Sequence, residues 1–174
     1  ALQQAVELYD DYKAKIAACD QQILAQLKTF DDRSGNGTPP PVLSKGWSPG
    51  HNGPAFDAPG EVYRMTGVDL TRIEGIQGHT ALKVVSEVGR DMSPWPTSKH
   101  FASWLGLCPD HRISGGKILG RSTRPVVSRA RNALRLCAYT LTHSQSWLGA
   151  KYRRLKAKLG APKAIVAMAH HLAR

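Results

Sequence analysis

The chain has few cysteines and no long hydrophobic run. Its three cysteines, Cys19, Cys108 and Cys137, are odd in number and widely spaced, so they form neither a disulfide framework nor a zinc motif. No stretch approaches the roughly 18 apolar residues of a membrane-spanning helix, and no signal peptide opens the chain. We therefore expect a cytoplasmic protein. Because helical sequence begins at once without an initiator Met, we also expect a piece of a longer protein.

Acidic residues are absent from the last 64 positions, His111 to Arg174, which carry 14 Lys or Arg. Residues 1–62 have a net charge of −3, whereas residues 63–174 have 5 acidic and 19 basic residues, a net of +14. A surface without carboxylates needs an anionic partner, and duplex DNA offers one charge per ~1.7 Å. This uneven charge favours nucleic-acid binding over a merely soluble basic protein.

Three regions follow from composition: an arm (1–30), a Gly/Pro-rich linker (31–61) and a domain (62–174). In the arm, apolar residues recur every seven positions, which predicts one helix over residues 2–30: Leu2, Tyr9, Ile16, Ile23 and Phe30. This period favours a coiled coil that makes a homo-oligomer. An amphipathic helix packed on its own domain is the alternative.

The linker contains 12 Gly or Pro between Asp31 and Gly60, and we expect Pro39 to Pro41, Ser48 to Gly50 and Ala58 to Gly60 to interrupt regular structure. Trp47 and Phe56 are unusual in a spacer and are expected to dock on a neighbour.

The domain is predicted to be all-α. We expect a helix, a tight turn and a helix over 70–89, a short helix to Leu107 with Phe101 and Trp104 inward, and a loop over 108–124 with a possible small hairpin at 114–119. A helix with Pro125 at its first position and helices over 147–159 and 162–172 complete the domain.

Residues Ile73 to Ala81 have a spacing similar to the helix-hairpin-helix motif of many DNA-binding proteins. Gly75 and Gly78 would let the backbone turn sharply, and the next helix would point N–H groups at a phosphate beside His79. An ordinary turn between two helices would also accommodate these glycines.

Arg124, Arg131 and Arg135 share one helical face, and no carboxylate lies three or four residues away to pair with them. A second basic cluster comprises Lys151, Arg153, Arg154, Lys156 and Lys158. Phosphate contact explains both clusters better than a solvated charged face.

Ser114 precedes two glycines and Lys117, with Arg112, Arg121 and Arg124 nearby in sequence. An exposed hydroxyl among cations suits nucleophilic attack on a phosphate, although such a sequence is usually just a loop. Weaker candidates are Ser122-Thr123, Tyr139 (expected to be partly buried) and Tyr152. His143 and His170-His171 lack further ligands at metal spacing.

Three passages, Phe101 to Pro109, Ser114 to Lys117 and Leu134 to Leu136, together resemble the C-terminal domain of the Piv/MooV-like transposases, the insertion-sequence one-ten family. The resemblance implies that Ser114 attacks DNA and forms a transient phosphoserine link. It also implies a RuvC-like domain with an acidic tetrad and Mg²⁺, and a structured guide RNA as partner. No acidic tetrad is recoverable here, so we expect this fragment to be inactive alone.

Two other functions remain open. A non-enzymatic helix-hairpin-helix module would dock a protein onto DNA, and Ser114→Ala would leave it unchanged. An RNA-binding scaffold would prefer folded RNA to duplex DNA.

Overall fold

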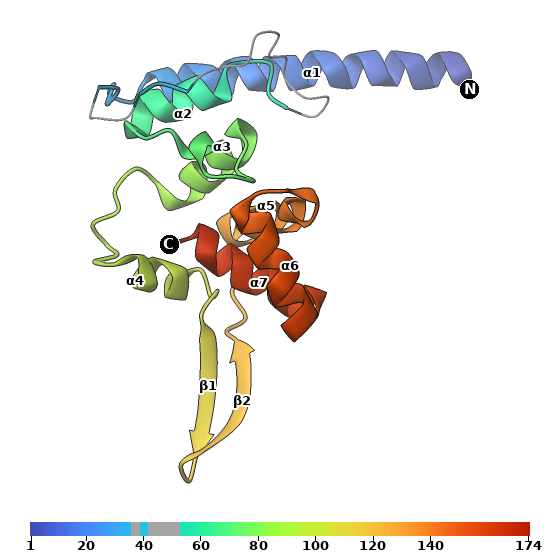
Figure 1. Cartoon of the computed structure of the whole chain (residues 1–174). Helices are drawn as coiled ribbons and strands as arrows, with labels where there is room; N and C mark the ends of the chain where they lie inside the picture. Colours follow the sequence, from blue (N-terminus) through green and yellow to red (C-terminus); the bar gives the residue numbers. More distant parts are fainter. Residues whose placement is uncertain (36–38, 42–52) are drawn as a thin grey trace. The chain divides into compact units, whose positions relative to one another are not determined.

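The computed structural model describes residues 1–35, 39–41 and 53–174 of the chain (Figure 1). The chain forms two compact units, unit 1 (Ala1–Leu70) and unit 2 (Thr71–Arg174). Helices dominate both, which confirms the predicted all-α class. Trp47, expected to dock on a neighbour, lies outside the described residues.

Unit 1 contains a long helix, α1 (Leu2–Lys28), and a short one, α2 (Ala58–Thr66). The predicted helix over 2–30 is therefore confirmed to within two residues. Its heptad side chains remain exposed, with Leu2 at 82% and Ile16 at 59% of their free surface. In the described part of the chain, most of the apolar stripe that the sequence predicts is therefore exposed, whereas the coiled coil itself stays a prediction.

The start of α2 contradicts the expectation that Ala58 to Gly60 interrupts regular structure. Asp57 caps the helix by accepting a hydrogen bond from the Gly60 N–H at 2.9 Å, and Pro59 suits a first helical turn. Phe56 is buried, as a docking residue should be.

Arg64 holds the two helices of unit 1 together. Its guanidinium donates to the carbonyl oxygens of Leu27 (2.6 Å) and Phe30 (2.8 Å) and pairs with Glu61 at 3.0 Å. These bonds tie α2 to carbonyls at and just beyond the end of α1.

The boundary between the units falls within a single 3₁₀ turn, η1 (Leu70–Arg72), where the sequence predicted the first helix of a helix-hairpin-helix. That prediction is wrong in length, because Gly75 with φ of 89° already turns the chain toward α3 (Gly78–Val88).

Next comes α4 (Ser98–Trp104), which ends before the predicted Leu107. Phe101 is buried as predicted, but Trp104 is 43% exposed instead of inward.

Two antiparallel strands follow, β1 (Pro109–Ser114) and β2 (Lys117–Thr123), where the sequence predicted a loop with a hairpin confined to 114–119. They extend away from the helices of unit 2 as a ribbon (Figure 1). The hairpin has a physical reason at its turn: Gly115 and Gly116 both have positive φ and join the strands by the two-residue connection that suits an antiparallel pair.

The remaining elements are α5 (Arg129–Thr140), η2 (Leu141–His143), α6 (Trp147–Leu159) and α7 (Ala161–Leu172). The predicted bounds of α6 are confirmed and those of α7 are right to within one residue. The predicted start of α5 at Pro125 is wrong, because Ser128 caps the helix by accepting from the Arg131 N–H at 3.0 Å.

The core of unit 2 surrounds α5, which contacts both α3 and α7, while α6 packs on α7. Small residues let these helices approach closely, and larger ones fill the remaining space. The buried side chains of the four helices include Ala81, Ala130, Ala133, Leu134, Cys137, Ala138, Tyr152, Ala164, Met168 and Ala169. This helical body carries the ribbon.

Candidate active site and nucleic-acid interface

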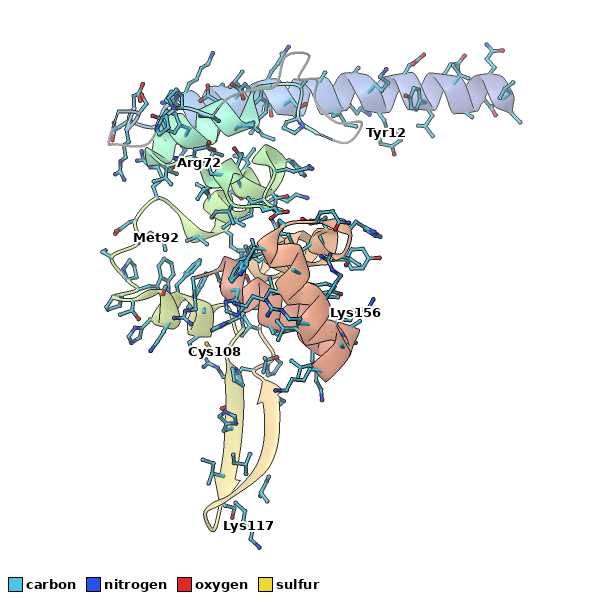
Figure 2. The ribbon with its side chains drawn as sticks, viewed as in Figure 1. Tyr12, Arg72, Met92, Cys108, Lys117 and Lys156 are labelled. Atoms are coloured by element: carbon cyan, nitrogen blue, oxygen red, sulfur yellow. The ribbon has the colours of Figure 1, made fainter. Side chains whose placement is uncertain are left out.

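Ser114 is the last residue of β1 and lies at the tip of the ribbon. Gly115 (φ 55°) and Gly116 (φ 73°) form the two-residue connection, and only glycine adopts two successive positive φ values without strain. The strand register pairs Ser114 with Lys117, which Figure 2 shows at the far end of the ribbon. Both residues are exposed. The predicted Ser-Gly loop is therefore a tight β-turn that presents a hydroxyl and an ammonium side by side in register.

The other predicted cations are spread along the ribbon. Arg112 is opposite Gly120, and Arg121 is opposite His111, three residue pairs away from the tip and thus roughly 10 Å distant. Arg124 lies beyond β2, where its Nη2 donates to the Ser103 carbonyl oxygen at 2.8 Å. Of the predicted phosphate-holding residues, only Lys117 is immediately beside Ser114.

Two arginines of α5 differ in what they contact. The Arg131 guanidinium donates to the Val126 carbonyl oxygen (3.0 Å) and to Thr123 Oγ1 (3.2 Å). Burial, and then the nearby Arg135, lowers the pKa of Arg131. Arg135 is exposed. Arg131 thus fastens the end of the ribbon to α5, whereas Arg135 is the more accessible cation for a ligand.

The turn before α3 packs against the end of α5. A Cβ on Gly75 would lie 3.0 Å from the Cys137 carbonyl oxygen, so close packing accounts for this glycine. Gly78 is buried in the first turn of α3, and His79 is exposed beside it. Contact of this turn with a DNA backbone stays a prediction, and His79 is its most accessible member.

Sequence reasoning missed the role of Glu74. Its carboxylate accepts a hydrogen bond from the Ser144 hydroxyl, which is also 2.9 Å from Ser146 Oγ, and Arg153 donates to the Ser144 carbonyl oxygen at 2.6 Å. The bonds from Ser144 and then Ser146 hold the pKa of Glu74 below its usual value. No signal within one helical turn of Glu74 could have revealed this link, because its partners are about 70 residues away.

A second acidic residue also serves the fold. The Glu87 carboxylate accepts from the Ala130 N–H at 2.5 Å and so caps α5 from α3. In unit 2, these two carboxylates therefore bind hydroxyl or backbone groups.

Helices α6 and α7 bring Lys151 and His171 together. The sequence indicated the basic residues of α6 but not their contact with α7. Lys151 Nζ lies 4.7 Å from the Trp147 ring centroid and 3.5 Å from His171 Nδ1. Burial, and then Arg174, lowers the pKa of His170, and burial followed by Lys151 lowers the pKa of His171. The four-residue spacing of Trp147 and Lys151 was the sequence signal for their contact.

The weaker nucleophile candidates also have defined places. Tyr139 is 57% exposed, so the expectation of partial burial was too strong, and Tyr152 is buried. Ser122 is exposed and lies opposite Asp110 at the base of the ribbon, and the hydroxyl of Thr123 accepts from Arg131.

Within residues 1–35, 39–41 and 53–174, no group of three or more His, Cys, Asp or Glu side chains is placed to hold a metal ion. The family resemblance places Mg²⁺ in a RuvC-like domain and not among these residues, so that expectation stays a prediction. None of the helices in this described part is long and apolar enough to cross a membrane.

Comparison with known proteins bears on the same segment. No curated protein matches the chain. A family model described as Transposase IS116/IS110/IS902 family matches residues 69–153, from η1 through the ribbon and α5 into α6. Ser114 and Lys117 lie near the middle of that match. Over this segment, which is just under half of the chain, the protein is similar to the IS116/IS110/IS902 transposase family.

Proposed function

We propose that this chain is the part of a DNA transposase that supplies a serine nucleophile, with Ser114 as the attacking residue. The observation that carries the proposal is the ribbon tip, where Ser114 is exposed and in register with Lys117, inside the segment that matches the family. A hydroxyl at a slender tip can reach a phosphodiester in a groove, and an adjacent ammonium stabilises the charge that develops on phosphorus.

In this reaction the Ser114 oxygen forms a bond to phosphorus, and the bond from phosphorus to one deoxyribose oxygen breaks. The departing oxygen takes up a proton, and the serine hydroxyl loses one. Along the ribbon the first carboxylate from Ser114 is Asp110, four residues back and thus roughly 13 Å away. No carboxylate of the ribbon is therefore close to Ser114, and we expect the group that accepts the serine proton to come from outside the ribbon, in keeping with a composite site.

DNA contact is expected to extend from the ribbon onto the helices. Arg112, Lys117 and Arg121 lie along the ribbon, and Arg135 and His79 are exposed on α5 and α3. Such contacts position the backbone without reading sequence. Target choice by a structured guide RNA, Mg²⁺ in a RuvC-like domain and oligomerisation through α1 belong to the same proposal as expectations from the family resemblance.

The test uses the complete transposase that contains this chain, with Mg²⁺, co-purifying RNA and a nicked suicide DNA substrate. A denaturing gel should show a covalent protein–DNA adduct in the wild type and in Ser122→Ala, a matched control on the same ribbon. Ser114→Ala should lose the adduct. An equal adduct in Ser114→Ala would move the chemistry to another residue. Bound DNA without an adduct in any variant would favour the helix-hairpin-helix docking module.

A further inference from the structure

The ribbon exposes large apolar side chains beside the proposed nucleophile. Ile113 is 64% exposed, Ile118 is 46% exposed and Leu119 is 72% exposed. Ile113 and Ile118 pair with one another directly below the pair Ser114 and Lys117. A two-stranded hairpin has no core of its own in which to bury such side chains. A cluster of exposed apolar side chains on it therefore indicates an interaction site.

Leu119 has a special place in the ladder. Arg112 pairs with Gly120 and Ile113 pairs with Ile118, so Leu119 is the extra residue of a β-bulge and has no partner across the ribbon. A bulge bends its strand and re-aims the side chain of the extra residue. Leu119, the most exposed of the three apolar residues, is thus also the one without a cross-strand partner.

The charges around these residues favour DNA as the partner. From His111 to Arg124 the chain has four cations, Arg112, Lys117, Arg121 and Arg124, and no carboxylate. Proteins that bind DNA through β-ribbons place the strands in the major or the minor groove. Proteins that bind the minor groove commonly insert Leu, Ile or Met between base pairs and so kink the duplex.

The spacing also matches. Successive residues of a strand rise about 3.3 Å, close to the ~3.4 Å rise of one base pair. The Ile113–Ile118 pair is one rank below Ser114. Because successive side chains of a strand point to opposite faces, this apolar pair would meet a base on one face of the ribbon while Ser114 meets the phosphate on the other.

We infer that Leu119, flanked by Ile113 and Ile118, is a wedge that unstacks one base step of the DNA and so exposes the neighbouring phosphate to Ser114. This inference rests on the proposed function for its purpose, although unstacking itself requires no chemistry. Pyrimidine–purine steps such as TA deform most easily and are the preferred site.

The test uses this chain and a duplex of about 30 base pairs, roughly three helical turns. A 2-aminopurine base beside a central TA step reports unstacking by increased fluorescence, and dyes at the two ends report bending by energy transfer. Wild-type protein should increase both signals. Ser114→Ala should give the same increases, so failure of the serine chemistry and failure of the wedge are distinguishable.

Leu119→Ser combined with Ile118→Ser should abolish the fluorescence increase, while duplex affinity at low salt falls by less than about tenfold because phosphate contacts supply most of it. Leu119→Met should retain unstacking, since methionine also serves as a wedge. Val127→Ser, which removes a fully exposed apolar residue between the ribbon and α5, is the matched control and should behave as the wild type.

A bound duplex without a fluorescence change in the wild type would overturn the inference, as would an unchanged signal in the double variant. If the double variant instead lost binding to a separately added acidic metal domain, the apolar residues would be covered by protein and not by a base step. Circular dichroism of each variant would confirm that the helical body is intact.

Discussion

The two units of the chain expose opposite kinds of side chain. In unit 1, α1 exposes an apolar stripe beside charged residues, and a charge pair forms within the helix, Lys15–Asp11 at 2.8 Å. In unit 2 cations are exposed, while Glu74 and Glu87 bind hydroxyl and backbone groups. Unit 1 is therefore suited to an apolar partner and unit 2 to an anionic one, although one continuous chain carries both.

Salt is expected to produce the largest difference between the two units, because it should weaken DNA binding by unit 2 but not self-association through α1. Raising the salt concentration from about 50 to about 200 mM should weaken duplex binding about a thousandfold if unit 2 contacts six phosphates. Self-association through α1 should hold or strengthen, because apolar burial is not screened. Fluorescence anisotropy with labelled DNA and sedimentation velocity of the same chain measure the two responses. A parallel loss of both would contradict the division of roles.

The second largest effect is expected when a charge is introduced into the apolar stripe of α1. Ile16→Asp should weaken self-association about tenfold or more, because burying one Ile contributes ~1.5–3 kcal/mol. Ala14→Asp introduces the same charge on the opposite side of α1 and serves as the control. Sedimentation at several concentrations gives both constants. If Ile16→Asp and Ala14→Asp behave alike, the stripe is not the self-association surface.

A third experiment tests whether every arginine in unit 2 serves the anionic partner. Arg131→Met should destabilise unit 2 by about 1.5–3 kcal/mol, because bonds from a charged group to Val126 and Thr123 are lost. Arg135→Met should leave the melting temperature unchanged and reduce the salt slope of DNA binding by about one. Thermal melts and binding isotherms of both variants are needed, and the reverse pattern would contradict the assignment.

This contrast shows where sequence reasoning succeeds. The period of α1 and the apolar stripe and proline punctuation of α6 and α7 are local, so these helices were predicted closely. That Ser114 and Lys117 lie close together could also be predicted from the sequence, because two glycines between them form a tight turn that places the flanking residues opposite each other. Local chemistry within a few residues is enough for such features.

The contacts that sequence reasoning did not find lie between residues that are far apart in the chain. Arg131 resembled a DNA-binding arginine because no carboxylate is near it in sequence, yet carbonyl and hydroxyl acceptors reach it only after the ribbon folds back to α5. Gly75 fitted a phosphate-binding turn, but its close neighbour is the Cys137 carbonyl, about 60 residues away. An absent ion-pair partner in sequence therefore does not make a cation available to a ligand.

The smallest expected effect concerns the acidic side of unit 2. Because hydrogen bonds from Ser144 and Ser146 lower the pKa of folded Glu74, its stabilising contribution is present above its unfolded pKa of about 4.3 and disappears as the pH falls through the folded value. Glu74→Gln should thus lower the melting temperature at neutral pH, and the gap from wild type should shrink in acid. Melts between neutral pH and pH ~3 measure it. If the difference in melting temperature between wild type and Glu74→Gln stayed constant with pH, Glu74 would stabilise unit 2 by packing and not through the charge of its carboxylate.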